Sequence, residues 1–343
     1  MSARGWVRVS RRHPCPICGK PDWCTVSADG LAICCMRTPG ERLLRNGGWL
    51  YRPARGALAW TTGETPAASG AIRAPAAVVD QVYRALLAEL ELSPADRAHL
   101  LGPRRGLSPE AIARNGYRSL PRAGRSALCR LLRTRLGPTL LGVPGFYLAS
   151  GRSGPYLTLA GPAGLLIPVR DVAGRIVGAQ IRSAGRGRRR YRWLSSAGRP
   201  QGVGSGSPVH VARPADLWNR RLWITEGPLK ADIAAEYLGA VVLGIAGTSA
   251  WRSAGTLEVV AALRPPVVSI AFDEDGRPTT ARHAADLATA LAEAGFRVRL
   301  AHWDPARGKG IDDLLVAGGS YQTSAFRSAW DGASVCFGWA AGW

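Results

Sequence analysis

Strand and helix signals alternate through the last third of this 343-residue sequence. From Leu222 onward, four continuous apolar runs (RLWITEG, AVVLGIAG, PVVSIAFDEDG and RVRLAHW) are separated by helical stretches such as PLKADIAAEYLG and TARHAADLATALAEAGF. Strands that are buried on both faces have unbroken apolar runs, and strands joined by helices lie parallel in one sheet. The sequence therefore predicts an α/β domain with a parallel, doubly wound sheet at residues 213–320.

Acidic residues directly follow two of the predicted strands. Glu226 comes after WIT and precedes Gly227 and Pro228, which suit a tight turn and a helix start. Asp273 and Asp275 follow the run SIAF. Because ligands of such sheets bind at the carboxyl ends of the strands, we expect three carboxylates to meet there, neutralised by Mg²⁺ or Mn²⁺. The alternative is that these acids only cap helix N-termini.

Charge is distributed unevenly along the chain. Residues 1–210 carry 32 basic and 10 acidic side chains, a net charge of +22, whereas residues 211–343 carry 13 and 14, a net charge of −1. This separation is typical of a polyanion-binding surface joined to a metal-holding domain, although solubility alone is an alternative. The run RGRRRYRW at 186–193 adds aromatic rings that can stack on bases while the arginines follow phosphates.

Five of the seven cysteines lie between Cys15 and Cys35. The spacing Cys15-x₂-Cys18-x₅-Cys24-x₉-Cys34 is typical of a closed, tetrahedral zinc site. Cys35 and His13 compete with this ligand set, because Cys35 is adjacent to Cys34 and His13 precedes the first Cys-x₂-Cys pair.

Composition and periodicity divide the rest of the chain. A Pro- and Ala-rich aperiodic stretch indicates a linker, and helical spacing followed by short β runs indicates a mixed domain. Ser93-Pro94 and Ser108-Pro109 are each typical of an N-cap with Pro at the first helical position, and DVAGR is typical of a hairpin turn. The predicted organisation is a zinc-binding unit at 1–52, a linker at 53–77, a helical then β-rich basic region at 78–212, the α/β domain at 213–320 and an irregular tail at 321–343.

The motifs ITEGPLKAD, GIAGTSAW, FDEDG and GKGIDDLL resemble the Toprim domain of primase-like proteins of phages and plasmids, over residues 220–316. Toprim domains also occur in topoisomerases, some nucleases and recombination proteins. The resemblance implies an acid/base role for Glu226 and magnesium binding by Glu226, Asp273 and Asp275. Lys230 stands where bacterial-type primases usually have an aspartate, and RPTT replaces the alanine-glycine that often follows their Asp-x-Asp. We include Lys230 among the catalytic candidates.

The resemblance extends upstream. GLLIPVRDVAGRIVGAQIRS and YRWLSS are similar to the segment that precedes Toprim in bacterial-type primases, where it builds a platform for template and nucleotides. Those primases also begin with a zinc ribbon, which implies this fold for residues 1–52. Together with the basic run and the Toprim motifs, this segment gives six candidate nucleic-acid-binding or nucleotide-binding residues: Arg170, Arg182, Arg190, Arg192, Trp193 and Lys309.

These observations predict a primase-like nucleotidyltransferase of a mobile element that makes primers on single-stranded DNA from nucleoside triphosphates, with Zn²⁺ and Mg²⁺ or Mn²⁺ as cofactors. No lysine precedes Ser or Thr, so a Walker A loop is missing and we expect a separate helicase in trans. No apolar run approaches the ~18 residues of a membrane span, and a cytoplasmic protein without membrane contact is expected. The alternatives are a Toprim phosphodiesterase that nicks nucleic acid and a non-catalytic DNA-binding replication protein.

Overall fold

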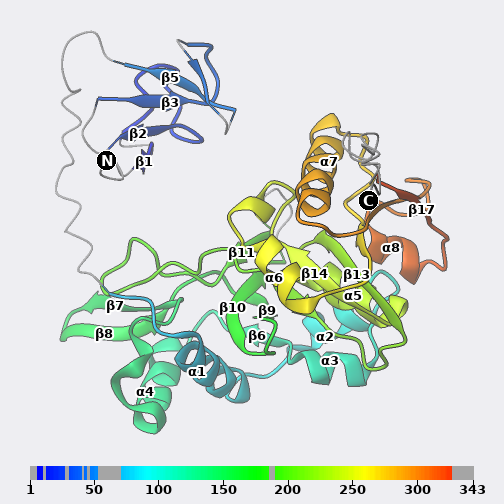
Figure 1. Ribbon diagram of the computed structural model, residues 1–343. Helices are drawn as coiled ribbons and strands as arrows, with labels where there is room; N and C mark the ends of the chain where they lie inside the picture. Colours follow the sequence, from blue (N-terminus) through cyan, green and yellow to red (C-terminus); the bar gives the residue numbers. More distant parts are fainter. Residues whose placement is uncertain are drawn as a thin grey trace, which may run out of the picture. The chain divides into compact units, whose positions relative to one another are not determined.

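The computed structural model describes residues 6–10, 13–27, 31–40, 42–44, 47–52, 71–184 and 190–326. The chain divides into two compact units, residues 1–67 and 68–343, and each is described by itself (Figure 1). Most of the predicted linker, at 53–70, and most of the predicted tail, at 327–343, lie outside the described residues. Among the described helices, none is long and apolar enough to cross a membrane.

The N-terminal unit is built on an antiparallel sheet, whose described strands follow the order β1-β2-β3-β5-β4. Its small core packs Val9, Val26 and Ile33 around buried cysteines. So few apolar side chains bury little surface, which is the usual reason for a metal in a unit of this size. The strands are β1 (Trp6–Arg8), β2 (Thr25–Ser27), β3 (Ile33–Cys35), β4 (Arg42–Leu43) and β5 (Trp49–Tyr51).

The larger unit begins with four helices: α1 (Ala76–Ala88), α2 (Pro94–Leu101), α3 (Pro109–Asn115) and α4 (Arg125–Leu136). Both predicted Ser-Pro caps are confirmed: Ser93 Oγ accepts the N–H of Asp96 at 3.2 Å, and Ser108 Oγ accepts that of Ala111 at 3.1 Å. The predicted helical stretch is interrupted by β6 (Arg118–Leu120), which pairs with a strand formed far along the chain. Because its partner lies far along the chain, the sequence of β6 itself has no pattern that predicts a strand.

A second antiparallel sheet has the order β11-β10-β9-β6. The predicted DVAGR turn is confirmed: the Asp171 N–H donates to the Arg175 carbonyl at 2.9 Å, and Gly174 has φ of 78°, which glycine adopts without strain. Helices α1 and α4 pack on this sheet through a shared apolar core. The strands of this region are β7 (Phe146–Gly151), β8 (Gly154–Leu159), β9 (Gly164–Arg170), β10 (Ile176–Arg182) and β11 (Tyr191–Trp193), with β7 and β8 forming a separate hairpin.

The third sheet contains the four predicted parallel strands at its centre, in the order β12-β14-β13-β15-β16-β17. The two edge strands, β12 and β17, are antiparallel to their neighbours. Side chains alternate along β13, so that Leu222 and Ile224 pack with α6 and α7 while Trp223 packs with α5 and α8. The strands are β12 (His210–Ala212), β13 (Asn219–Glu226), β14 (Ala240–Ile245), β15 (Val268–Ile270), β16 (Val298–His302) and β17 (Gln322–Ala325), and the helices are α5 (Pro228–Leu238), α6 (Thr256–Leu263), α7 (Pro278–Glu293) and α8 (Ile311–Val316).

Two features depart from the predicted organisation. Residues 322–325 of the predicted irregular tail form β17, because the polar sequence QTSA completes the sheet by pairing with β16 and shows no apolar alternation of its own. The parallel sheet and the basic region also share a core, in which Leu229 and Ile233 of α5 pack with Leu165 and Ile167 of β9. The residues at 78–212 and 213–320 therefore lie in one compact unit.

Candidate active site and metal centre

The first acidic residue lies where β13 ends. Glu226 is its last residue, and Gly227, with φ of +80°, turns the chain into α5. The backbone N–H of Asp273, beyond the end of the neighbouring strand β15, donates to Glu226 Oε1 at 3.4 Å. The structure therefore brings Glu226 and Asp273 together at the carboxyl edge of the sheet, as the parallel arrangement requires.

Two lysines bind the Asp273 carboxylate. Lys230, on the first turn of α5, contacts Oδ1, and Lys309 Nζ lies 2.7 Å from Oδ2 and 3.8 Å from a carboxylate oxygen of Asp275. The Asp273 side chain is only 5 % exposed, and each of its two oxygens is paired with a lysine. Lys309, which we expected to contact nucleic acid, is thus part of the acidic edge.

The electrostatics of Glu226 and Asp273 differ. Burial raises the pKa of Glu226, the neighbouring Asp273 charge raises it further, and Lys230 only partly offsets the two. Burial opposes ionisation of Asp273 as well, but Lys230 and Lys309 outweigh it and lower the pKa of that carboxyl. Glu226 is therefore the carboxyl whose pKa moves toward neutral pH, where a proton acceptor works best.

The three predicted magnesium ligands do not form one cluster. In the part of the chain that the structure describes, the only set of three or more His, Cys, Asp or Glu side chains with all ligand atoms within 4.8 Å of one another consists of cysteines. Asp275 turns instead to Arg277, whose Nε lies 3.5 Å from Asp275 Oδ2. Carboxylates are suitable donors for Mg²⁺, but with Asp273 paired to two ammonium groups the arrangement does not fit the predicted three-carboxylate site.

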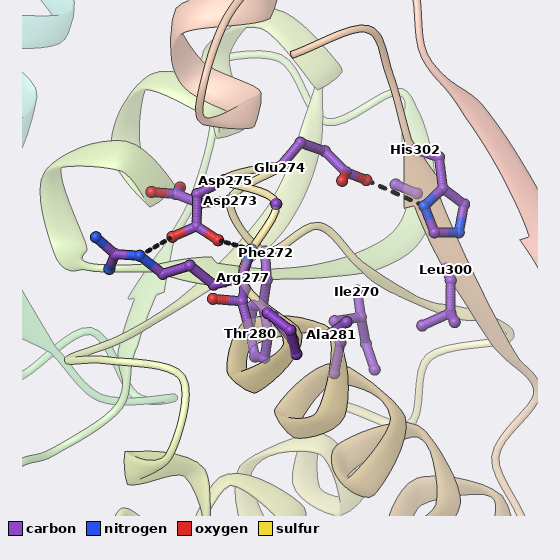
Figure 2. A pocket seen from close by; sticks show the side chains of 14 residues that line it. Ile270, Phe272, Asp273, Glu274, Asp275, Arg277, Thr280, Ala281, Leu300 and His302 are labelled. Atoms are coloured by element: carbon purple, nitrogen blue, oxygen red, sulfur yellow. Dashed lines mark hydrogen bonds and ion pairs between the residues drawn. The ribbon is translucent and has the colours of Figure 1, made fainter.

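Two pockets lie at this edge, and they share none of their lining residues. One, with a cavity volume of about 320 Å³, lies between β15, β16 and α7 and is lined by Asp273 and Asp275 above an apolar floor (Figure 2). Figure 2 also shows Glu274 reaching His302, whose Nδ1 is 3.0 Å from Oε1. Glu226 does not line this pocket, so the predicted acids face two separate spaces.

The second pocket, of about 390 Å³, joins the acidic edge to the β10–β11 platform. Glu226 and Lys230 line one side, and the other side has two aromatic rings, a guanidinium and an amide from Tyr191, Trp193, Arg192 and Gln180. Arg192 and Trp193 were predicted binding residues. Gln180 was missed, because only the pairing of β10 with β11 places it opposite Trp193.

The other predicted arginines have different surroundings. Arg182 is only 7 % exposed, and Arg170 is half-buried, with its guanidinium donating to the Asn115 carbonyl at 2.9 Å. Arg190 is exposed at the start of β11. The arginines at 186, 188 and 189 in the predicted basic run fall outside the described residues.

The cysteine cluster consists of Cys15, Cys18, Cys24 and Cys35, and thus differs from the predicted set by one ligand. Cys34 and Cys35 are neighbours on β3, and successive side chains of a strand point to opposite faces, so only one of them can join the cluster. The exposed His13 lies outside it as well. The four-cysteine cluster fits a zinc ribbon.

The sulfur positions suit a zinc ion. Cys24 Sγ lies 3.7 Å from Cys18 Sγ and 3.9 Å from Cys35 Sγ, close to the separation of about 3.8 Å that tetrahedral Zn–S bonds of about 2.3 Å require. The N–H of Met36 donates to Cys24 Sγ at 3.3 Å, and that of Thr38 to Cys35 Sγ at 3.4 Å. Burial raises the pKa of Cys15 and Cys24, but at Cys35 the N–H groups of Arg37 and Thr38 outweigh burial and hold the pKa at about 7, which favours the thiolate of that one ligand.

Comparison with known proteins shows which folds the chain resembles. The family model described as "Domain of unknown function (DUF3854)" matches residues 217–322, less than a third of the chain. No functionally curated protein matches the sequence. The matched segment begins just before β13 and ends at the start of β17, so it coincides with the parallel sheet and its acidic edge.

Several solved primase structures resemble the chain. The zinc-binding and RNA polymerase domains of the Aquifex aeolicus primase match with a TM-score of 0.51 and 15% identity, covering 71% of this chain and 62% of that one. A DnaG primase catalytic domain bound to single-stranded DNA matches with a TM-score of 0.48 and 21% identity, covering 71% and 78%. A primase domain from Pseudomonas aeruginosa matches with a TM-score of 0.47 and 18% identity, covering 71% and 75%. The Aquifex match establishes that the chain shares the fold of a bacterial primase core.

Proposed function

We propose that this chain is a primase-like nucleotidyltransferase that synthesises a primer on single-stranded DNA from nucleoside triphosphates. In this proposal the parallel sheet is a Toprim domain and the N-terminal unit is a zinc ribbon. The protein is encoded by a mobile element, and a separate helicase acts with it in trans. The observation that carries the proposal is the pocket in which aromatic and basic side chains of β10–β11 face Glu226 and Lys230. Basic side chains can bind phosphates, aromatic rings can stack on a base, and a carboxylate can accept the proton of a reacting hydroxyl.

The residues of this pocket have distinct tasks in the proposed reaction. The rings of Tyr191 and Trp193 would stack on a base, and Arg192 and Lys230 would hold phosphate oxygens. Glu226 would take the proton of the primer 3′-hydroxyl while that oxygen attacks the α-phosphate and pyrophosphate leaves. Magnesium would enter bound to the triphosphate, as part of the substrate.

Replacing the proposed base tests this function. We expect Glu226→Gln to lower primer synthesis by about 10²–10⁴-fold, because the amide keeps the shape but cannot accept the proton. The measurement is incorporation of labelled nucleotides on single-stranded DNA with Mg²⁺ or Mn²⁺. Glu293→Gln, at the exposed C-terminal end of α7, is the matched control and should retain wild-type activity. Undiminished synthesis by Glu226→Gln would refute the proposal, provided that both variants bind single-stranded DNA like the wild type.

A non-catalytic DNA-binding replication protein is the second candidate, because Lys230 and Lys309 already neutralise the Asp273 carboxylate that a metal-dependent enzyme would use. Such a protein would bind single-stranded DNA and yield no product with or without triphosphates. The same assay without triphosphates also tests a nicking phosphodiesterase, which needs only metal and nucleic acid.

A further inference from the structure

We propose that Lys230 takes the place of a divalent cation as the counter-ion of Asp273, so that this edge of the sheet gains tight Mg²⁺ or Mn²⁺ binding only when the ammonium is removed. The inference rests on the proposed function only in that Lys230 serves both. Metal binding by the free protein tests it without nucleotide or DNA.

The position of Lys230 is set by the start of α5. The turn at Gly227 begins the helix directly after β13, and Lys230 then reaches Asp273 Oδ1 from within the first turn. The Lys230 side chain is 24 % exposed and that of Asp273 is 5 % exposed, so the contact is largely shielded from water. A shielded ion pair is strong because little solvent screens it, and breaking it leaves an uncompensated buried charge.

A second buried carboxylate lies near the ammonium. A Cβ at Gly310 would lie 2.4 Å from Asp312 Oδ1, 2.9 Å from Lys230 Nζ and 3.1 Å from Asp273 Oδ1, so these three atoms surround one small space that only glycine leaves open. Asp312 is fully buried, and although its Oδ2 pairs with Arg105 at 2.6 Å, its Oδ1 has no hydrogen-bond partner. Lys230 thus pairs with Asp273 and lies in the field of a second buried acid, Asp312, whose own ion pair is with Arg105.

A metal ion could not be added to this arrangement without displacing an ammonium. Mg²⁺ binds carboxylate oxygens at about 2.0–2.1 Å, and both oxygens of Asp273 are occupied by lysines that would repel it. The two lysines differ in mobility, because the side chain of Lys309 is 56 % exposed and can move into solvent. Lys230 is largely buried beside Asp273 and Asp312 and is the one that excludes the metal.

Manganese binding by the zinc-loaded full chain tests the proposal. Free Mn²⁺ is measured by electron paramagnetic resonance in the wild type, Lys230→Met, Lys230→Gln and Lys309→Met, each with and without Asp273→Asn. We expect the Lys230 variants to bind Mn²⁺ at least about tenfold more tightly than the wild type, because removing the ammonium frees an Asp273 oxygen and ends its repulsion. Lys309→Met is the matched control, since it removes a charge from the same carboxylate, and it should change the affinity much less.

The gain must depend on Asp273, so Asp273→Asn should abolish it in the Lys230 background. Because Lys230→Met leaves the buried Asp273 with only the exposed Lys309 as its counter-ion, a Mn²⁺-dependent rise in Tm, seen in the Lys230 variants and not in the wild type, is the second measurement. Tight Mn²⁺ binding by the wild type that Asp273→Asn removes would overturn the proposal, and so would Lys230→Gln and Lys230→Met proteins that fold but gain no affinity. Neither outcome depends on whether the protein makes primers.

Discussion

Two consecutive cysteines on β3 show how a single residue position decides the metal site. Cys35 points into the cluster with Cys15, Cys18 and Cys24, while its neighbour Cys34 is buried on the opposite face of the strand. Spacing along the chain tolerates either residue as the fourth ligand. Only the register of β3 against β2, in which Cys34 lies opposite Thr25, selects Cys35.

Zinc content tests this assignment at the residue scale. We expect Cys35→Ser to lose most of the bound zinc, from about one ion per chain, because a three-cysteine set cannot close the tetrahedron. Cys34→Ser, the matched neighbour, should keep its zinc and lose only a little stability. Elemental analysis of both freshly purified variants gives the answer, and loss of zinc from Cys34→Ser alone would restore the spacing-based ligand set.

At the scale of elements, α5 connects the acidic edge to the basic region. It carries Lys230 at its start and, on the buried side, Asp232, which accepts the Tyr117 hydroxyl at 2.6 Å and pairs with His210 Nε2 at 2.8 Å. The N–H of Arg170 donates to His210 Nδ1 at 3.0 Å, so the ring proton lies on Nε2 and is donated to Asp232. This buried network fastens α5 to β9, β12 and the segment between α3 and β6.

Removing one donor from the network tests its contribution to stability. We expect Tyr117→Phe to lower the free energy of unfolding by about 1.5–3 kcal/mol, because a buried carboxylate loses a charge-assisted hydrogen bond. Tyr237→Phe is the matched control: its hydroxyl reaches the Gly106 carbonyl at 3.3 Å on the surface and should contribute less than about 1 kcal/mol. Urea unfolding measures both, and equal losses would show that the network has no special role.

For the molecule as a whole, the positively charged residues 1–210 do not form a part that is structurally separate from the rest of the chain. Cutting after residue 210 would divide β12 and remove the buried His210 from Asp232. The compact unit at 68–343 contains 35 basic and 20 acidic side chains, a net charge of +15. The charge that predicts a polyanion-binding surface therefore lies mainly in this unit, which includes the acidic edge.

Salt dependence tests that assignment. We expect residues 68–343 to bind single-stranded DNA with an affinity that falls steeply with salt, with a log–log slope of about −3 or steeper if four or more phosphates are neutralised at about 0.7 each. Fluorescence anisotropy over a range of salt concentrations gives the slope, with the full chain as the reference. An affinity that does not change with salt would contradict phosphate contact as the basis of binding.

Properties that depend on neighbouring residues could be predicted from the sequence. Unbroken apolar runs between amphipathic stretches are the direct consequence of burial on both faces, so the four parallel strands β13 to β16 follow from the pattern alone. The Ser-Pro caps and the DVAGR turn are equally local, because each is made by residues within one turn. The topological rule that ligand groups gather where parallel strands end correctly placed Glu226 beside Asp273.

The tertiary structure alone decided the features that depend on distant residues. Strands β6 and β17 exist because distant strands offer them unpaired edges. The partner of a buried charge is likewise whatever the fold brings within a few ångströms: Lys230, 43 residues before Asp273, and Lys309 converge on one carboxylate and compensate a charge for which the sequence predicted a metal ion. No spacing rule encodes that meeting, because it results from the packing of α5 and the Lys309 loop against the end of β15.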